Sequence, residues 1–150
     1  KEIKISEVLN EGQQIDIHAI TKGKGFQGPV KRFGINIRSH KSEKTKRGPG
    51  NVGSWTGNRS IPVPHAGQMG FHQRTEYNKQ ILKISDDVKK INVIGGFLRY
   101  GEVRNQYALV RGSVAGASKR LIKMTPSIRP DKTMPKEAPQ ITFISRESKQ

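Results

Sequence analysis

A glycine-rich motif near the start of the chain is the first candidate for chemistry. Residues 23–28 read GKGFQG and match G-x-G-x-x-G, in which glycines let phosphates approach the backbone. A dinucleotide fold would continue with a full helix and then a parallel strand that ends in an acid. Here Pro29 and Gly34 follow closely, and a basic run comes next. The sequence therefore argues against a dinucleotide-binding enzyme. Two interpretations remain: a flexible backbone whose lysines approach phosphates, or a plain glycine turn with solvated lysines.

Four histidines, His18, His40, His65 and His72, are the candidate metal ligands. A zinc site needs two ligands at short helical or hairpin spacing and further ligands elsewhere. His65 and His72 are seven positions apart with no acid between them, and the chain has no cysteine. The sequence therefore predicts no metal site and no cofactor. We expect these imidazoles to contact phosphates or bases, or to be ordinary exposed groups.

Nucleophilic and acid–base catalysis find no support in the sequence. No G-x-S-x-G motif occurs, and the acids lie mainly in turns and near the chain ends, so no carboxylate pair is expected to share a cleft. The absence of cysteine also excludes disulfides and thiol catalysis. We therefore expect no enzyme and no catalytic residues.

The single tryptophan, Trp55, stands in an unusual stretch, GPGNVGSWTGNRSIPVPHAGQMG (residues 48–70). That stretch holds six glycines and three prolines and has no apolar periodicity. Irregular loops longer than about 12–15 residues are usually either functional or disordered. Large apolar side chains on a free tip would promote aggregation, whereas bases of RNA stack well on tryptophan. We interpret Trp55 as a stacking tip; the alternative is that it folds back onto the protein core.

The charge of the chain indicates a polyanionic partner. Its 150 residues carry 28 Lys and Arg against 12 Asp and Glu, a formal net charge of +16, and only 32% are apolar. A compact monomer with this charge repels itself, so nucleic acid is the first candidate partner and an anionic membrane surface the second. No apolar run approaches the roughly 20 residues of a spanning helix, and no signal peptide opens the sequence.

Short strands separated by glycine and proline predict a mainly β fold, either a small barrel or a sandwich, interrupted by a long basic segment. Strand patterns occur at residues 1–9, 15–20, 81–84, 107–110, 121–124 and, unless this segment is a docked tail, 141–144. Residues 91–94 and 97–103, on either side of Gly95 and Gly96, suggest paired strands or a bulge. Side chains alternate between the two faces of a strand, so the strand expected at residues 15–20 places Ile15, Ile17 and Ala19 on one face and Asp16 and His18 on the other. The predicted core consists of Ile15, Ile17, Ile81, Leu82, Ile84, Val93, Phe97, Leu98, Leu109, Val110, Leu121 and Ile122.

Several segments closely resemble one family over nearly the whole chain. They are TKGKGFQGPVKRFG (residues 21–34), GSW (53–55), AGQMGFHQRTEYNKQILKI (66–84), GGFLRYGEV (95–103), ALVRGSVAGASKRLI (108–122) and the closing ISRESKQ. They are similar to the universal large-subunit ribosomal protein three family in its archaeal and eukaryotic form.

The resemblance implies a translation-protein-type β-barrel and a structural role in the large ribosomal subunit. It divides the chain into a barrel portion (residues 1–20 and 76–128), a basic extension that penetrates rRNA (21–75) and a Pro- and Lys-rich tail (129–150). The implied partners are large-subunit rRNA of the 23S type, in its 3′ region and near the peptidyl-transferase centre, and neighbouring large-subunit ribosomal proteins. No membrane, DNA or cofactor is implied, and the expected location is the cytoplasmic ribosome.

The family also implies support of early assembly and a tip called the tryptophan finger, which Trp55 matches by its GSW context. From the residues and the resemblance together we expect one set of RNA contacts. They are Lys22, Lys24, Lys31, Arg32, Arg38, His40, Lys41, Lys44, Lys46, Arg47, Trp55, Arg59, His65, Gln68, His72, Arg74, Lys119 and Arg120. The alternative is a generic basic RNA-binding or chaperone protein without a fixed ribosomal site.

Two features depart from the family pattern. Family members are much longer, with a region before the equivalent of Lys1, so we expect this chain to be the C-terminal part, as a fragment or a split gene product, with an incomplete barrel. The segment RSHKSEKTKRGP (residues 38–49) also differs: position 43 is Glu, and His40 lies farther from the tryptophan than the modifiable histidine of eukaryotic relatives. The modification is therefore not carried over.

Overall fold

The computed structural model describes residues 3–41, 43–53 and 62–148, and within them the protein is mainly β with short helices. Internal contacts divide the chain into two compact units. The sheet unit comprises Lys1–Ile20 and Gln73–Gln150, and the basic unit comprises Thr21–His72. Each unit is described separately below.

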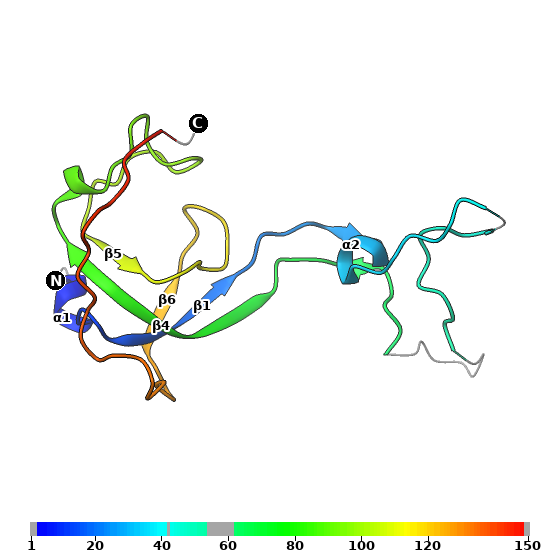
Figure 1. The fold of residues 1–150 in the computed structure, drawn as a ribbon, viewed down its shortest axis with the longest axis horizontal. Coiled ribbons are helices and arrows are strands. Elements are labelled where there is room, and N and C mark those ends of the chain that lie inside the picture. The colour runs from blue at the N-terminus through cyan, green and yellow to red at the C-terminus, as the bar shows by residue number, and fades with distance from the viewer. Residues whose placement is uncertain (1–2, 42, 54–61, 149–150) are drawn as a thin grey trace. The chain divides into compact units, whose positions relative to one another are not determined.

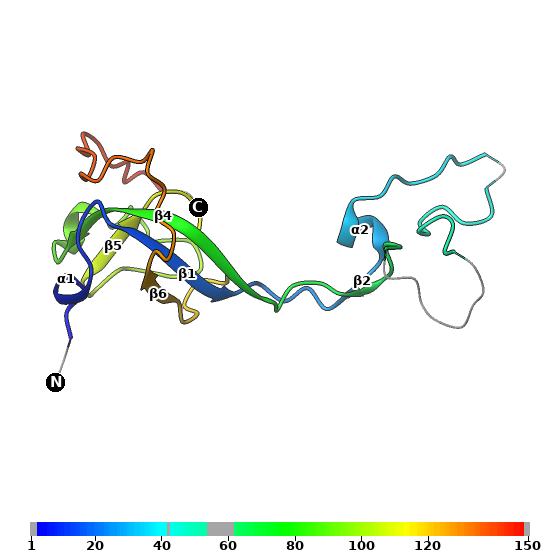
Figure 2. The ribbon, with the colours of Figure 1, turned by 90° about the horizontal axis from the view of Figure 1, so that it is seen from below.

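Four antiparallel strands form the sheet of the sheet unit, in the order β5-β4-β1-β6 (Figures 1 and 2). Their bounds are β1 Gln14–Ile20, β4 Gln73–Ser85, β5 Tyr107–Val110 and β6 Lys123–Pro126. In this register Ile15 of β1 lies opposite Lys79 of β4 and Pro126 of β6. Because β5 and β6 each pair on one side only, the sheet is open in the described residues and a closed barrel is not seen there.

The other described elements are short. They are α1 (Ile5–Val8), β2 (Phe26–Gln27), α2 (Pro29–Phe33), β3 (Gly67–Gln68) and the 3₁₀ helix η1 (Val88–Lys90). β2 and β3 pair with each other and belong to the basic unit, as does α2.

Alternating apolar residues of β1 form the centre of the core, as the sequence predicts. Ile15 and Ile17 are 0% and 1% exposed and pack with Leu9 and Ile81. Burying each such side chain contributes about 1.5–3 kcal/mol. Five half-buried residues surround this cluster: Ile5, Ile84, Val110, Ile122 and Met124. The core is small, in keeping with the low apolar content of the chain.

The segment that follows β4 differs from its prediction. Residues 91–94 and 97–103 form turns instead of strands, and Phe97 and Gly101 make only an isolated bridge. Gly95 and Gly96 have φ angles of 83° and 78°, a left-handed backbone that breaks an extended path. Two predicted core residues are also exposed, Leu98 by 61% and Leu121 by 88%. The predicted strands at 91–94 and 97–103 and the predicted burial of Leu98 and Leu121 are therefore wrong, because they were based on apolar content alone.

Both ends of the sheet unit also differ from a simple strand pattern. The predicted strand over residues 1–9 is wrong, because Ile5–Val8 forms α1, and Leu9, which donates its N–H to the Ile5 carbonyl at 2.9 Å, enters the core. At the other end, residues 141–144 form no strand. The alternative of a docked tail fits this segment, because the Ile94 N–H donates to the Arg146 carbonyl at 2.9 Å.

A buried carboxylate fastens three segments of the sheet unit. Asp16 is 0% exposed, and its Oδ1 accepts the Asn78 N–H at 3.0 Å while Oδ2 accepts the Ile128 N–H at 3.1 Å. Asn78 lies in a bulge of β4 and has a φ of 55°, so the carboxylate holds a backbone that an unassisted chain adopts rarely. The sequence pattern placed Asp16 on the face opposite Ile15 without indicating that Ile128, just after β6, binds it.

Two opposing effects act on the pKa of Asp16. Burial raises it, but the N–H groups of Asn78 and Ile128, the Ser127 hydroxyl and the nearby His18 together outweigh burial. The pKa of Asp16 therefore lies below its ordinary value, and the ionised form stabilises the fold.

Replacing this carboxylate tests its contribution to the fold. Because Asp16 has a depressed pKa in the folded state, its stabilisation is complete above the unfolded pKa of about 3.9 and is lost as the pH falls through the folded value. We expect Asp16→Asn to lower the free energy of unfolding at pH 7 by about 2 kcal/mol or more. When the pH is then lowered below about 4, the free energy of unfolding should fall less in the variant than in the wild type, because the variant has no carboxylate at this position to protonate. Urea titrations at several pH values measure both. Asp86→Asn, at an exposed position, is the control; equal behaviour of the two variants would contradict the assignment.

Candidate nucleic-acid interface

Charge separates the basic unit from the sheet unit. The basic unit holds ten Lys and Arg and one acid, Glu43, whereas the sheet unit holds eighteen Lys and Arg and eleven acids. Glu43 lies 3.4 Å from Arg38, and about 40% of each side chain is exposed. Such an exposed pair contributes little, and the other cations of the unit have no carboxylate within it. The carboxylates of this unit therefore neutralise almost none of its positive charge.

Most of the expected RNA contacts of the basic unit lie at its surface. The exposed ones are Lys22, Lys24, Lys31, Arg38, His40, Lys41, Lys44, Lys46, Arg47 and Gln68. Arg32, His65 and His72 are half-buried. Trp55 and Arg59 lie outside the described residues. Among the residues of this unit that the structure describes, Pro29 alone is buried, so the unit has scarcely any core.

A two-stranded ribbon organises the glycine motif. β2 pairs with β3, and next to them the Lys24 N–H donates to the Met69 carbonyl and the Met69 N–H to the Gly25 carbonyl, both at 2.9 Å. The helix that follows, α2, has five residues and ends at Gly34, which has a φ of 69°. A helix of this length is not the one that a dinucleotide fold needs after its glycines. The motif thus runs along one side of the ribbon and contains β2.

Close backbone approach in the ribbon requires glycine at position 70. A Cβ at Gly70 would lie 1.9 Å from the Lys22 carbonyl oxygen, and the φ of this residue is 71°. For both reasons, any residue larger than glycine at position 70 would force the backbone to move. Nearby, the Gln68 amide donates to the Met69 and Gly70 carbonyls at 3.1 Å each, so this side chain holds the backbone that follows β3.

Arg32 is an expected RNA contact whose guanidinium is held by the backbone of the basic unit and by a neighbouring ring. Its Nη1 donates to the His65 carbonyl at 2.8 Å, and its Cζ lies 5.0 Å from the centroid of the Phe33 ring. A Cβ at Gly67 would come within 3.0 Å of Nη1, so the guanidinium packs directly against this glycine. Arg32 therefore differs from the exposed lysines, whose side chains extend into solvent.

The histidines have different surroundings. The two ring nitrogens of His18 lie 2.9 Å from the Thr75 hydroxyl and 3.2 Å from the Thr125 hydroxyl, so its ring bridges neighbouring strands of the sheet unit. The His72 N–H donates to the Thr21 hydroxyl, while Nε2 of His65 is buried with no partner in the part of the chain that the structure describes. That part also holds no cluster of three His, Asp or Glu residues suited to a metal ion.

Arg74, Lys119 and Arg120, also expected to contact RNA, belong to the sheet unit. All three are exposed, and Arg120 donates from Nη1 to the Ile20 carbonyl at 3.2 Å. They are thus not part of the charge cluster of the basic unit. Among the exposed aromatic residues that were not expected contacts, Phe26 is 76% and Phe33 54% exposed. Their proximity to Lys24 and Arg32 in the sequence is the signal that could have indicated them.

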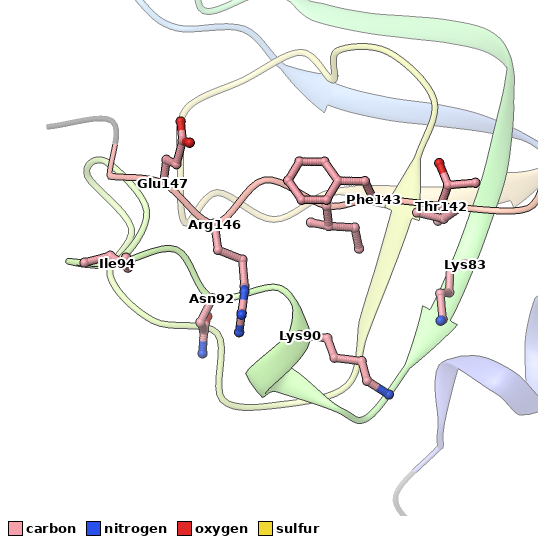
Figure 3. A pocket seen from close by; sticks show the side chains of 10 residues that line it. Lys83, Lys90, Asn92, Ile94, Thr142, Phe143, Arg146 and Glu147 are labelled. Carbon is pink, nitrogen blue, oxygen red and sulfur yellow. The ribbon is translucent and has the colours of Figure 1, made fainter.

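A groove of about 730 Å³ lies in the sheet unit between residues 83–94 and the tail segment 141–147. Figure 3 shows Lys83, Lys90 and Arg146 around it. Lys90 pairs with Asp87 at 3.0 Å, and Arg146 donates from Nη1 to the Lys89 carbonyl at 3.1 Å. Two of these three cations are therefore already engaged within the protein. Within residues 3–41, 43–53 and 62–148, no helix is long and apolar enough to cross a membrane.

Comparison with known proteins gives one consistent result. The family model described as ribosomal protein L3 matches residues 1–150. Large ribosomal subunit protein uL3 of Methanothermobacter thermautotrophicus is 51% identical over 155 residues, covering 100% of this chain and 46% of that protein. The corresponding proteins of Methanopyrus kandleri and Archaeoglobus fulgidus are 48% and 51% identical, again over 100% of this chain, and 42% and 46% of their own lengths are covered. The chain thus spans less than half the length of these curated relatives.

Substituting Gly70 tests the geometry of the ribbon. In Gly70→Ala the new methyl group would overlap the Lys22 carbonyl, so we expect the ribbon to open and the amide protons of Lys24 and Met69 to lose their protection from hydrogen exchange. Gly28→Ala is the matched control, because its φ is −72° and nothing lies within 4 Å of the new Cβ. Equal protection in both variants would show that the close approach at Gly70 is not required.

Proposed function

The chain belongs to the ribosomal protein L3 family, a family of structural ribosomal proteins and not of enzymes, and we propose that it binds large-subunit rRNA through its basic unit. One observation carries this proposal. The basic unit has ten cations, one acid and, among its described residues, a single buried residue, Pro29. A segment that can neither neutralise its charge nor bury its apolar side chains internally needs a partner that does both.

RNA meets both requirements of the basic unit. Its phosphates supply countercharge for the exposed lysines and arginines, and the release of condensed cations from the RNA drives their association. Its sugars and unpaired bases supply surfaces for the glycine-rich backbone and for aromatic side chains. The cost of ordering the unit is then met when the ribosomal particle assembles.

The finer functional assignment also belongs to this proposal. By resemblance, the basic unit extends into 23S-type rRNA of the 3′ region toward the peptidyl-transferase centre, with Trp55 as its tip. The protein would support early assembly and contact neighbouring large-subunit proteins in the cytoplasmic ribosome. The identity to uL3 relatives along all of this chain supports these roles.

Barrel closure is proposed on similar grounds. β5 and β6 are open edges of the four-stranded sheet, and open edges are usually paired or covered in native proteins. The uL3 relatives have more than half of their length outside the match. We infer that strands from that part of the family fold complete the barrel.

Charge removal tests RNA binding by the basic unit. Replacing Lys41, Lys44, Lys46 and Arg47 by glutamine should lower the affinity for large-subunit rRNA transcribed in vitro. It should also flatten the logarithmic salt dependence of binding, by about 0.7–0.9 for each phosphate that the variant no longer neutralises. The measurement is a filter-binding titration at several salt concentrations.

The matched control removes the same charge from the sheet unit, with Lys89, Arg104, Arg129 and Lys132 replaced by glutamine. Equal reductions of affinity in both variants would mean that net charge alone attracts RNA. Equal affinity of the wild type for rRNA and for unrelated RNA would favour the alternative of a generic RNA-binding protein without a fixed site.

The tryptophan tip makes a separate prediction. In Trp55→Ala the lysines remain, so we expect the variant to be incorporated into large subunits, which then translate more slowly because the tip no longer stacks on RNA. Sedimentation profiles measure incorporation, and translation by purified subunits measures activity. Normal translation by the mutant subunits would contradict the role given to Trp55.

A further inference from the structure

We propose that Phe33, with the Arg32 guanidinium over its ring, is a preformed platform on which an unpaired RNA base stacks. This inference rests on the proposed function, because it names a further contact of the same basic unit. It assigns a recognition role to a phenylalanine that is not among the expected RNA contacts.

The position of Phe33 is fixed although its ring is exposed. It is the last residue of α2, where the Arg32 N–H donates to the Gly28 carbonyl at 3.0 Å and the Gly34 N–H to the Val30 carbonyl at 2.9 Å. Pro29, at the start of the helix, is buried, which anchors the turn in the unit. Even so, 54% of Phe33 is exposed. An exposed aromatic side chain on an ordered turn provides contact area at a low entropic cost.

Arg32 is the second layer of the platform. Three contacts hold its guanidinium: the His65 carbonyl at 2.8 Å, the backbone of Gly67, and the Phe33 ring, whose centroid lies 5.0 Å from Cζ. In the part of the chain that the structure describes, this is the one cation placed over an aromatic ring. A planar cation on a ring is a stable stack, and RNA-binding proteins stack bases on both kinds of surface.

The charge around the platform identifies the partner as nucleic acid. A protein surface that covered Phe33 would have to accept the neighbouring Lys31 and the other cations of a unit with a single acid. RNA brings a base for the ring and phosphates for the lysines in the same strand. The platform is unsuited to a rigid duplex, since paired bases do not present their faces; an unpaired base is the expected occupant.

Binding by full-length variants tests the platform directly. With large-subunit rRNA transcribed in vitro as the probe, Phe33→Leu should lower affinity about tenfold, within the range measured for removal of one base–aromatic stack. Phe33→Tyr keeps an aromatic face and should bind within about twofold of the wild type. The salt dependence should be unchanged in both, because no phosphate contact is removed. Phe143→Leu, at an 81% exposed phenylalanine of the sheet unit, is the matched control and should bind as the wild type does.

A second pair of probes separates base stacking from a change of shape. The wild type should bind oligoadenylate more tightly than an abasic oligoribonucleotide of the same length, and Phe33→Leu should reduce that preference. Hydrogen exchange at the Gly34 N–H reports whether α2 is intact in each variant. A decrease in affinity that Tyr does not rescue, or that is the same with the abasic probe, overturns the stacking role.

The remaining outcomes distinguish the two proposals. If the wild type binds rRNA with strong salt dependence and Phe33→Leu binds equally well, the platform is wrong and rRNA binding by the basic unit stands. If the wild type does not bind rRNA, both proposals fail. If Phe33→Leu keeps its rRNA affinity but no longer associates with another ribosomal protein, the exposed ring serves a protein partner and the platform is again wrong.

Discussion

The basic unit holds ten positive side chains and one carboxylate, and this imbalance limits how closely the segment can pack on itself. Like charges at short range repel, so the segment gains nothing from collapsing on itself. Its ribbon of two short strands and its single turn of helix are held by backbone hydrogen bonds and close glycine contacts, with Pro29 as the one buried residue among those described. In our proposal, RNA phosphates provide the countercharge that this unit lacks.

The sheet unit is built on the opposite principle. Ile15, Ile17, Leu9 and Ile81 form a core, and charge is closer to balance. Asp16 adds a buried carboxylate that fastens the bulge of β4 to Ile128, just after β6. The chain leaves this unit at Ile20 and re-enters it at Gln73, and these two residues are paired in the sheet. Both ends of the basic unit are therefore joined to paired strands of the sheet.

The parts that could be predicted from the sequence are those in which local pattern and tertiary packing agree. β1 alternates strictly, and this strand is found where the sequence predicts it. The run at 91–103 is apolar enough for strands, but the left-handed backbone at Gly95 and Gly96 depends on context that a pattern does not contain. The burial of Asp16 arises from residue 128, more than a hundred positions away. The Arg32–Phe33 stack needs His65 and Gly67, so neither its rigidity nor its exposure is evident from local sequence.

Sedimentation of the chain in a lysate of cells that produce it, through a sucrose gradient at high salt, tests the central claim most directly. Basic proteins held only by scattered phosphate contacts dissociate under these conditions, because each contact adds to the salt dependence. If RNA supplies both countercharge and packing for the basic unit, the chain will sediment with the large ribosomal subunit. A chain that remains at the top of the gradient, while the other large-subunit proteins stay with the particle, would contradict the account.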